Sequence, residues 1–377
     1  MAQIAELLAY NANVFDHSRL NCFDFPLPSG RHVLAWKQYM DEAQSRGVFE
    51  TLKLRLVQLR FEVREGISQT AMYRAATLRG MPVDDRIIEK GLVLQVPEVL
   101  ELAIHQSLAG EIPVIIAPNR TDFVSLVQSL AMRNEPKLVP ESMGACMIKG
   151  FNNWDRIGQY RKLWEGRNPN NCSEADWKTE FQRIIPQKQL YQDHFMILSD
   201  GPYSGVPAED IGLSEEEWKH ISMTIRREHE CTHYFTERVF NSMRNNLIDE
   251  LIADYMGITI AIGKYKSDWF LRFLGLESWP DFRSDGRLQN YRGTPALSDG
   301  SFKILQLLVK TAAENLEKFD MEHSEELHHF EKKLQLLIAL THFTLEELAS
   351  DQMPDLLEKD WCNLSESIYL KIEELIN

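Results

Sequence analysis

The chain has 377 residues, of which 44% are hydrophobic, and its formal net charge at pH 7 is −15. This length allows one large domain or two to three ordinary ones, with enough apolar side chains for a sizeable core. The acidity argues against nucleic acid as a partner, because proteins that bind the phosphate backbone are basic.

The cysteines and the hydropathy pattern bear on the cellular compartment. The five cysteines are odd in number, far apart and without a CxxC pair, which argues against a disulfide framework or a cysteine-rich zinc module. The first residues show no basic segment followed by a long apolar run, and no stretch approaches the roughly 20 apolar residues of a membrane span. We therefore expect a cytoplasmic protein that does not associate with membranes.

The first 165 residues are predicted to form a mixed α/β region of unknown role. Apolar periodicity predicts helices over residues 34–61, with an interruption near Gly47, over residues 99–107 and over residues 122–132. Residues 111–118 are an apolar run bounded by prolines, which predicts a short buried strand. The region contains no glycine-rich phosphate loop.

A polar, turn-forming segment at residues 165–172 is the best candidate for a domain boundary. Beyond it the pattern predicts a helix from Ser173, a strand over residues 194–199 and a loop with several glycines and prolines. Residues 279–300 are predicted as loop, and residues from 302 onward as amphipathic helix almost throughout. We accordingly expect three regions: residues 1–165, 173–300 and 301–377.

A long helix is predicted to begin after Ser214. Ser214 and Glu217 have the spacing of a capping box, and the apolar stripe that follows extends the helix to about residue 240. Trp218 and Ile225 belong to this stripe, and His229 and His233 continue it. Both histidines are therefore predicted to face the interior.

These histidines belong to an HExxH motif, His229-Glu230-Cys231-Thr232-His233. Histidines four apart lie one above the other on a helix, so that both imidazoles can reach one zinc ion. The intervening Glu230 can take a proton from a water molecule on the metal and deliver it to a leaving amine. The simpler alternative is two ordinary helix histidines satisfied by local hydrogen bonds.

The next predicted helix, over residues 247–258, strengthens the metal hypothesis. It is apolar almost all round and should be buried, yet it carries Glu250 and Asp254 on one face. Buried carboxylates require a partner or a metal. We expect Glu250 to be the third metal ligand and Asp254 to hold the tautomer of a ligating histidine, with Asp249 doing the same for the other.

The pair of motifs, HExxH at residues 229–233 and ExxxD at residues 250–254, resembles the gluzincins, the thermolysin-like clan of zinc peptidases. The resemblance covers roughly residues 213–257. It implies one zinc ion per chain and a peptide or protein substrate. It also implies an edge strand before the active helix that pairs with the substrate backbone, for which residues 194–199 are the candidate, and a largely helical domain over residues 302–377.

Members of this clan also supply a side chain that steadies the oxyanion of the tetrahedral intermediate. The polar loop after the second helix offers Arg287, Asn290 and Tyr291, of which Tyr291 is the first choice. The competing interpretation of Tyr291 is a half-buried loop tyrosine without a catalytic role.

The sequence thus predicts an α+β fold with a zincin-like catalytic core, in which an active-site helix lies on a small sheet. A mixed α/β part should precede this core and a mostly helical part should follow it. The predicted function is zinc-dependent hydrolysis of amide or peptide bonds with Glu230 as general base. Two alternatives stay open: a non-catalytic zinc-binding protein with structural or regulatory zinc, and a metal-free buried charge network that joins two helices.

Overall fold

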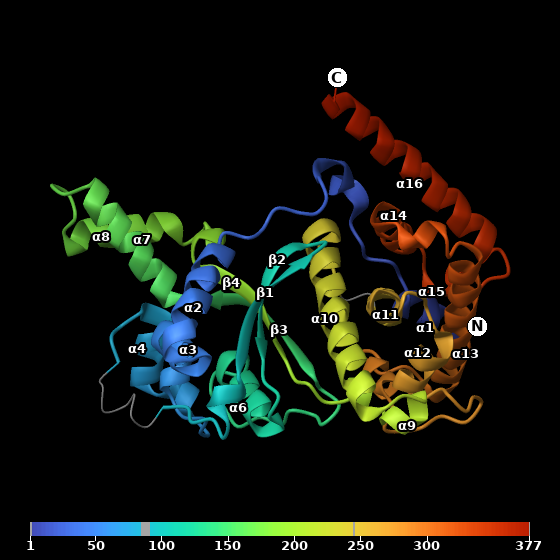
Figure 1. The fold of residues 1–377 in the computed structure, drawn as a ribbon, viewed down its shortest axis with the longest axis horizontal. Helices are drawn as coiled ribbons and strands as arrows, with labels where there is room; N and C mark the ends of the chain where they lie inside the picture. Colours follow the sequence, from blue (N-terminus) through green and yellow to red (C-terminus); the bar gives the residue numbers. More distant parts are fainter. Residues whose placement is uncertain (1, 84–90, 244–245, 377) are drawn as a thin grey trace. The chain divides into compact units, whose positions relative to one another are not determined.

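The structure is a computed structural model that describes residues 2–83, 91–243 and 246–376. It is an α+β protein whose chain forms two compact units (Figure 1). The sheet unit comprises Pro26–Gly201, and the helical unit comprises Met1–Phe25 together with Pro202–Asn377. The expected boundary at residues 165–172 instead lies inside the sheet unit, as the turn between two helices. The last strand of the sheet ends at Leu198, after this turn, and pairs with two strands that precede the turn. The segments on both sides of the turn therefore belong to the same unit.

The sheet unit contains four strands in the order β1-β2-β4-β3. Antiparallel pairs join β1 to β2 and β3 to β4, and a parallel pair joins β2 to β4. The strands are β1 (Glu101–Ser107), β2 (Gly110–Ile116), β3 (Ala145–Asn152) and β4 (Gln192–Leu198). The predicted strands over residues 111–118 and 194–199 are confirmed. The expectation that the second of these is an edge strand is wrong, because β4 lies between β2 and β3.

The helix predicted over residues 99–107 is also wrong, because this segment is β1. Short apolar runs are compatible with helix and strand alike, and pairing with a neighbour decides between them. Here a tight hairpin returns the chain at Gly110, which has φ +84 and pairs across from Ser107. A Cβ atom at Gly110 would lie 2.7 Å from the carbonyl oxygen of Leu27. The positive φ and this close approach both require glycine at the turn.

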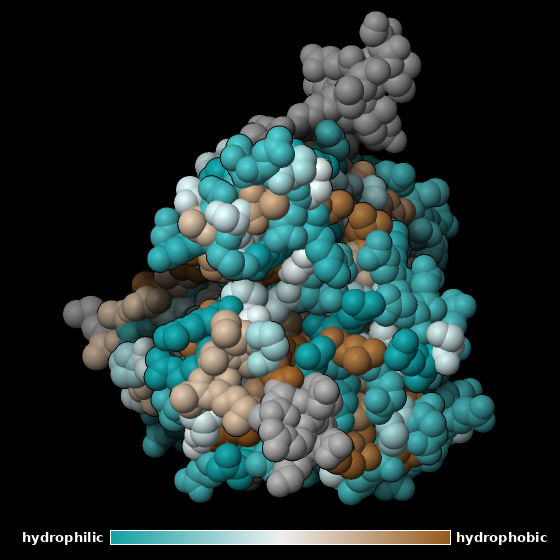
Figure 2. Space-filling model, turned by 90° about the vertical axis from the view of Figure 1, so that its left-hand side faces the viewer, coloured by the Kyte–Doolittle hydropathy of each residue, from teal (hydrophilic) through white to brown (hydrophobic). Residues whose placement is uncertain are grey.

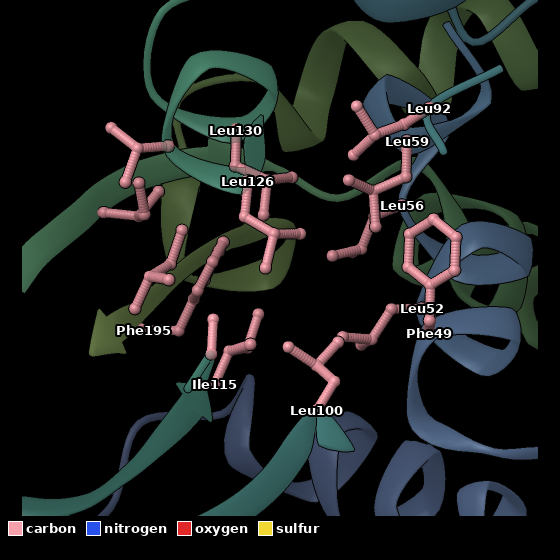
Figure 3. Close-up of a cluster of buried hydrophobic side chains, with 14 of the residues drawn as sticks. Phe49, Leu52, Leu56, Leu59, Leu92, Leu100, Ile115, Leu126, Leu130 and Phe195 are labelled. Atoms are coloured by element: carbon pink, nitrogen blue, oxygen red, sulfur yellow. The ribbon is translucent and has the colours of Figure 1, made fainter. Parts of the chain in front are cut away.

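Several helices pack on the sheet through an apolar core. Leu52, Leu126 and Phe195 are fully buried in this core and point toward one another in Figure 3. The predicted helices over residues 34–61 and 122–132 are confirmed, and the first is interrupted at Gly47 as expected. The described helices of the sheet unit, with 3-10 helices labelled η, are α2 (Val33–Arg46), α3 (Val48–Arg55), η2 (Val57–Arg60), η3 (Ile67–Gln69), α4 (Ala71–Arg79), η4 (Pro97–Val99), α6 (Arg120–Leu130), α7 (Trp154–Arg167), α8 (Glu174–Ile184) and η5 (Lys188–Leu190).

The described part of the helical unit contains helices and loops. Its elements are α1 (Ala2–Tyr10), η1 (His17–Cys22), η6 (Tyr203–Gly205), α9 (Ala208–Ile211), α10 (Glu215–Phe240), α11 (Leu247–Ile262), α12 (Ser267–Leu274), η7 (Arg287–Tyr291), α13 (Asp299–Glu322), η8 (Glu326–His328), α14 (Phe330–Leu340), α15 (Leu345–Leu348) and α16 (Met353–Ile376). The predicted loop over residues 279–300 is confirmed in part, because it contains the short 3-10 helix η7 and ends where α13 begins at Asp299. The helical C-terminal region is confirmed. In the described residues no helix has the length and apolar character needed to cross a membrane.

Hydrophilic residues dominate the face of the molecule in Figure 2, and the hydrophobic residues visible there form separate patches. The large apolar side chains of both units are mostly interior, with Trp36 and Trp218 almost fully buried. Burial of these side chains is the main source of stability that the sequence provides.

Helices α10 and α11 have local reasons for their positions. Ser214 and Glu217 form the predicted capping box at the start of α10, and Asn241 ends the helix in a left-handed conformation. The two helices pack closely at Gly257, where a Cβ atom would lie 2.8 Å from the carbonyl oxygen of Ile225. Glycine at this position therefore permits the approach that brings the polar residues of the two helices together.

Candidate metal centre

Two histidines of α10 and one carboxylate of α11 meet inside the helical unit. The Nε2 atoms of His229 and His233 lie 3.0 Å apart. Oxygen atoms of Glu250 lie 3.6 Å from Nε2 of His229 and 3.4 Å from Nε2 of His233. Both histidines are buried, with 6% of each residue exposed, as their position on the apolar stripe predicted.

These distances fit one metal ion. Zinc binds histidine nitrogen and carboxylate oxygen at about 2.0–2.2 Å, so tetrahedral ligands are about 3.3 Å from one another. The three separations of 3.0, 3.4 and 3.6 Å bracket this value. Among the described residues, His229, His233 and Glu250 form a group whose ligand atoms all lie within 4.8 Å of one another. Two imidazoles and one carboxylate are a donor set that leaves a fourth position for water or substrate.

Asp254 lies one helical turn beyond Glu250 and contacts the far side of the His229 ring. Its Oδ1 atom is 2.7 Å from Nδ1 of His229. Burial opposes ionisation of Asp254, but the charge of Arg287 and the hydrogen bond with His229 outweigh it and lower the pKa of the carboxyl group. Asp254 is therefore ionised and accepts a hydrogen bond from Nδ1–H of His229, which leaves the lone pair of Nε2 directed at the other ligand atoms.

Two side chains from the short 3-10 helices η6 and η7 hold Asp254 in place. The hydroxyl of Tyr203 donates to Oδ1 of Asp254 at 2.5 Å and lies 3.0 Å from Nδ1 of His229. Nη2 of Arg287 forms an ion pair with Oδ2 of Asp254, and its Nη1 donates to the Tyr203 hydroxyl at 3.0 Å. The Asp254 side chain has no exposed surface, so these contacts are shielded from solvent and from salt.

The ligand residues perturb one another electrostatically. Burial alone would lower the pKa of His233, but its hydrogen bond to Glu250 and the charge of that residue raise the pKa to about 9. Burial alone would raise the pKa of Glu250, but the two histidines hold it well below its ordinary value. Without a metal, the cluster therefore carries a proton on His233 and a negative charge on Glu250 at neutral pH.

Glu230 differs from the ligand residues in its exposure and contacts. It is half-buried on α10 and makes no hydrogen bond or ion pair with the described residues. Its charge contributes to the raised pKa of His233, which places it within electrostatic reach of the cluster. A carboxylate that is near the ligands and uncommitted can exchange a proton with a bound molecule.

The other predicted residues fall at different distances from the ligands. Tyr291 is buried in η7 and forms a hydrogen bond with Glu250, and burial together with the charge of Glu250 raises its pKa well above 10. Asp249 is buried on α11, and its charge also contributes to the raised pKa of His233. Asn290 is exposed. Arg287, which the sequence offered only as a possible oxyanion donor, instead forms an ion pair with Asp254.

Sequence reasoning missed Tyr203 and Tyr10. Tyr203 comes from a glycine- and proline-containing loop without periodicity, so no pattern marked it. Tyr10 ends α1, and its hydroxyl donates to the carbonyl oxygen of Tyr291. Burial and the charge of Glu250 raise the pKa of Tyr10. The N-terminal segment therefore contacts the loop that carries Tyr291, a relationship that only the folded chain reveals.

The fold and the site together define an α+β protein with a buried group of two histidines and a glutamate that could hold a metal ion. Residues 1–352 match the model of a family of unknown function (DUF7005), and the chain belongs to this family. No curated protein and no solved structure matches the chain.

Proposed function

We propose that this protein is a zinc-dependent hydrolase that cleaves amide or peptide bonds, with α10 and α11 as the helix pair of a zincin-like catalytic core. The observation that carries the proposal is the convergence of His229, His233 and Glu250 beside an uncommitted Glu230. A structural zinc site is usually closed by four protein ligands, whereas three ligands and a free carboxylate are typical of catalysis.

The ligand residues have clear roles in this proposal. A zinc ion held by His229, His233 and Glu250 would polarise the substrate carbonyl and lower the pKa of a water molecule. Asp254 keeps the proton of His229 on Nδ1, so that Nε2 is available as a ligand. Tyr203 and Arg287 in turn orient Asp254.

The remaining residues handle protons and charge. Glu230 accepts the proton of the attacking water and passes it to the leaving amine, which needs a carboxylate that is ionised before the reaction. A tyrosine hydroxyl is protonated at neutral pH, and the raised pKa of Tyr291 keeps it so, which allows it to donate a hydrogen bond to a developing oxyanion. In the structure the Tyr291 hydroxyl forms a hydrogen bond with Glu250. It must break this hydrogen bond before it can donate one to the substrate.

The proposal includes a cytoplasmic location and a peptide or protein substrate. Support for a reducing compartment comes from the cysteines whose side chains are described, none of which forms a disulfide: Cys146, Cys172, Cys231 and Cys362. The substrate class follows from the resemblance to peptidases rather than from any feature of the pocket.

The test combines metal analysis with a hydrolysis assay on untagged full-length protein. We expect about one zinc ion per chain by elemental mass spectrometry in the wild type and in Glu230→Gln, and much less in Glu250→Ala. The exposed Glu216→Ala on the same helix as the motif is the matched control and should keep its zinc.

A peptide library then separates catalysis from structural zinc. Cleavage by the wild type and its loss in Glu230→Gln, with zinc retained, would support the hydrolase. Zinc without cleavage would favour a structural or regulatory zinc protein. Absence of zinc from the wild type, even after incubation with zinc, would leave a metal-free charge network as the better account.

A further inference from the structure

The sheet unit contains a pocket of about 670 Å³. Its lining comes from the edge strand β3, from α4, from η2 and the segment around η3, and from the C-terminal end of α6 with the residues that follow it. All of these segments belong to the sheet unit, whereas the metal ligands all belong to the helical unit. The pocket is therefore a feature separate from the candidate metal centre, and its volume is in the range of roughly 300–1,000 Å³ common for small-molecule sites.

Among the described residues, the charged lining of this pocket is entirely basic. Arg74, Arg133 and Lys149 line it, and no aspartate or glutamate is among the lining residues. This is unusual for a chain with 56 acidic and 41 basic residues. Within the described part of the chain, Arg74 and Arg133 form no hydrogen bond or ion pair. No carboxylate among the described lining residues neutralises these two positive charges.

Glu135, the acidic residue nearest to Arg133 in the sequence, forms its hydrogen bonds with the backbone of another segment. Glu135 accepts hydrogen bonds from the backbone N–H groups of Gly66 and Ser68, at 2.8 and 2.9 Å. These hydrogen bonds lower the pKa of Glu135, so that it stays ionised while it holds the η3 segment. Glu135 therefore shapes the pocket wall and does not serve as the partner of an arginine.

The backbone that presents Arg133 is fixed in an uncommon conformation. Arg133 and Asn134 have φ values of +58 and +60, in the left-handed region that residues other than glycine rarely adopt. Asn134 is fully buried, and its amide donates to the carbonyl oxygens of Gln58 and Phe61, at 3.0 and 3.1 Å. It also accepts from the Tyr73 hydroxyl at 3.1 Å. Strained backbone of this kind persists where the surroundings over-determine it, which is common at ligand sites.

We propose that this pocket binds a small polyanion that carries phosphoryl or carboxylate groups. Arg74 and Arg133 would each offer a planar guanidinium group suited to paired hydrogen bonds with such groups, and Lys149 would add a third positive charge. Uncharged polar lining residues, among them Gln58, Gln69 and Asn152, favour a hydrophilic ligand over an apolar one. The proposal does not depend on the function of the metal centre.

The experiment is isothermal titration calorimetry of the metal-free full-length protein with pyrophosphate and, separately, with citrate. Metal-free protein is used because both probes chelate metals. We expect one of them to bind with one site per chain and a dissociation constant below about 1 mM at physiological ionic strength. Tighter binding of pyrophosphate would assign the site to phosphoryl ligands, and tighter binding of citrate would assign it to carboxylates.

A pair of double variants tests the location of the site. R74Q/R133Q should weaken binding at least tenfold, because each arginine contributes charge-assisted hydrogen bonds. R31Q/R46Q removes the same number of charges from exposed positions of the sheet unit outside the pocket and should bind like the wild type. Thermal melting checks that both variants fold. Failure of both probes to bind, or equal affinities of R74Q/R133Q and R31Q/R46Q, would overturn the proposal.

Discussion

Asp254 and His229 are joined by a hydrogen bond of 2.7 Å between Oδ1 and Nδ1, and this bond determines which nitrogen of the histidine faces Glu250. Asp254→Asn should keep the shape of the site but weaken control over the tautomer of His229. We expect zinc affinity to fall about 10- to 100-fold, as is usual for loss of such a partner. Competition with a chromophoric chelator measures this affinity.

The matched control is Asp320→Asn in the same unit. Asp320 is also a buried aspartate that accepts from a tyrosine hydroxyl, at 2.7 Å, but it does not contact a candidate ligand. Its substitution should destabilise the protein without changing zinc affinity. A similar loss of affinity in both variants would mean that Asp254 acts only through stability.

Tyr203→Phe tests the hydrogen bond that the Tyr203 hydroxyl donates to Asp254. The variant leaves Asp254 without a donor at 2.5 Å and Arg287 without an acceptor at 3.0 Å. We expect the free energy of unfolding to fall by about 1–3 kcal/mol, because buried polar groups lose their partners. Zinc affinity should fall as well, since Asp254 is no longer held against His229.

Tyr255→Phe separates these two effects. Tyr255 is fully buried and donates to Asp320, so its substitution should give a comparable loss of stability by chemical denaturation. Its zinc affinity should equal that of the wild type. If Tyr203→Phe also keeps wild-type zinc affinity, Tyr203 is a structural residue and no part of the metal centre.

The sequence predicted the motif-bearing helices well because their signals are local. The capping box at Ser214, the apolar stripe and the spacing of His229 and His233 all lie within one helix. Glu250 could be added because a carboxylate in an apolar helix requires a partner. Each inference needed only a short segment and the geometry of the α-helix.

The sequence failed where distant segments meet. Tyr203 and Arg287 reach Asp254 from short 3-10 helices, and nothing in their own neighbourhoods indicates a buried aspartate as partner. The segment 101–107 became a strand through its pairing with β2, and the position of β4 inside the sheet depends on β3. Such contacts depend on how the whole chain folds, so the resulting errors concerned strand identity, strand order and the residues around the ligands.

The pKa of His233 leads to a prediction about pH. In the metal-free protein the proton on His233 persists up to about pH 9, so zinc must displace it at neutral pH. Zinc affinity should therefore fall about tenfold for each pH unit below 9, and binding should release about one proton. Calorimetry at pH 7.5 in buffers of different ionisation enthalpy measures this release; a value near zero would contradict the protonated state of the cluster.

The same shift affects the stability of the metal-free protein. A histidine whose pKa is raised on folding stabilises the native state fully below its unfolded pKa of about 6.5. This contribution is lost as the pH rises through about 9. The control is the zinc-loaded protein, in which His233 has no proton to lose and this pH dependence should be absent.

Removal of the metal should lower thermal stability by an amount that mass action sets. With free zinc at 1,000 times its dissociation constant, the native state gains about 4 kcal/mol. For a unit of this size that corresponds to about 8–16 °C in melting temperature. Differential scanning calorimetry with and without chelator measures the shift. It should vanish in Glu250→Ala and persist in Glu216→Ala; a shift that survives in Glu250→Ala would place the stabilising metal elsewhere.

Tyr291→Phe distinguishes a catalytic tyrosine from a partner of Glu250. The hydroxyl of Tyr291 contacts Glu250, and its raised pKa keeps it a donor at neutral pH. If it steadies an oxyanion, its loss should lower kcat for a cleaved peptide by about 100- to 1,000-fold with little change in KM or zinc content. If it only orients Glu250, its loss should weaken zinc binding, and kcat at saturating zinc should stay near the wild-type value.

Tyr10→Phe is the companion variant, because the Tyr10 hydroxyl contacts the backbone of Tyr291 and not its side chain. If Tyr10→Phe lowers kcat as much as Tyr291→Phe does, the position of the loop, and not the Tyr291 hydroxyl itself, accounts for the loss of activity.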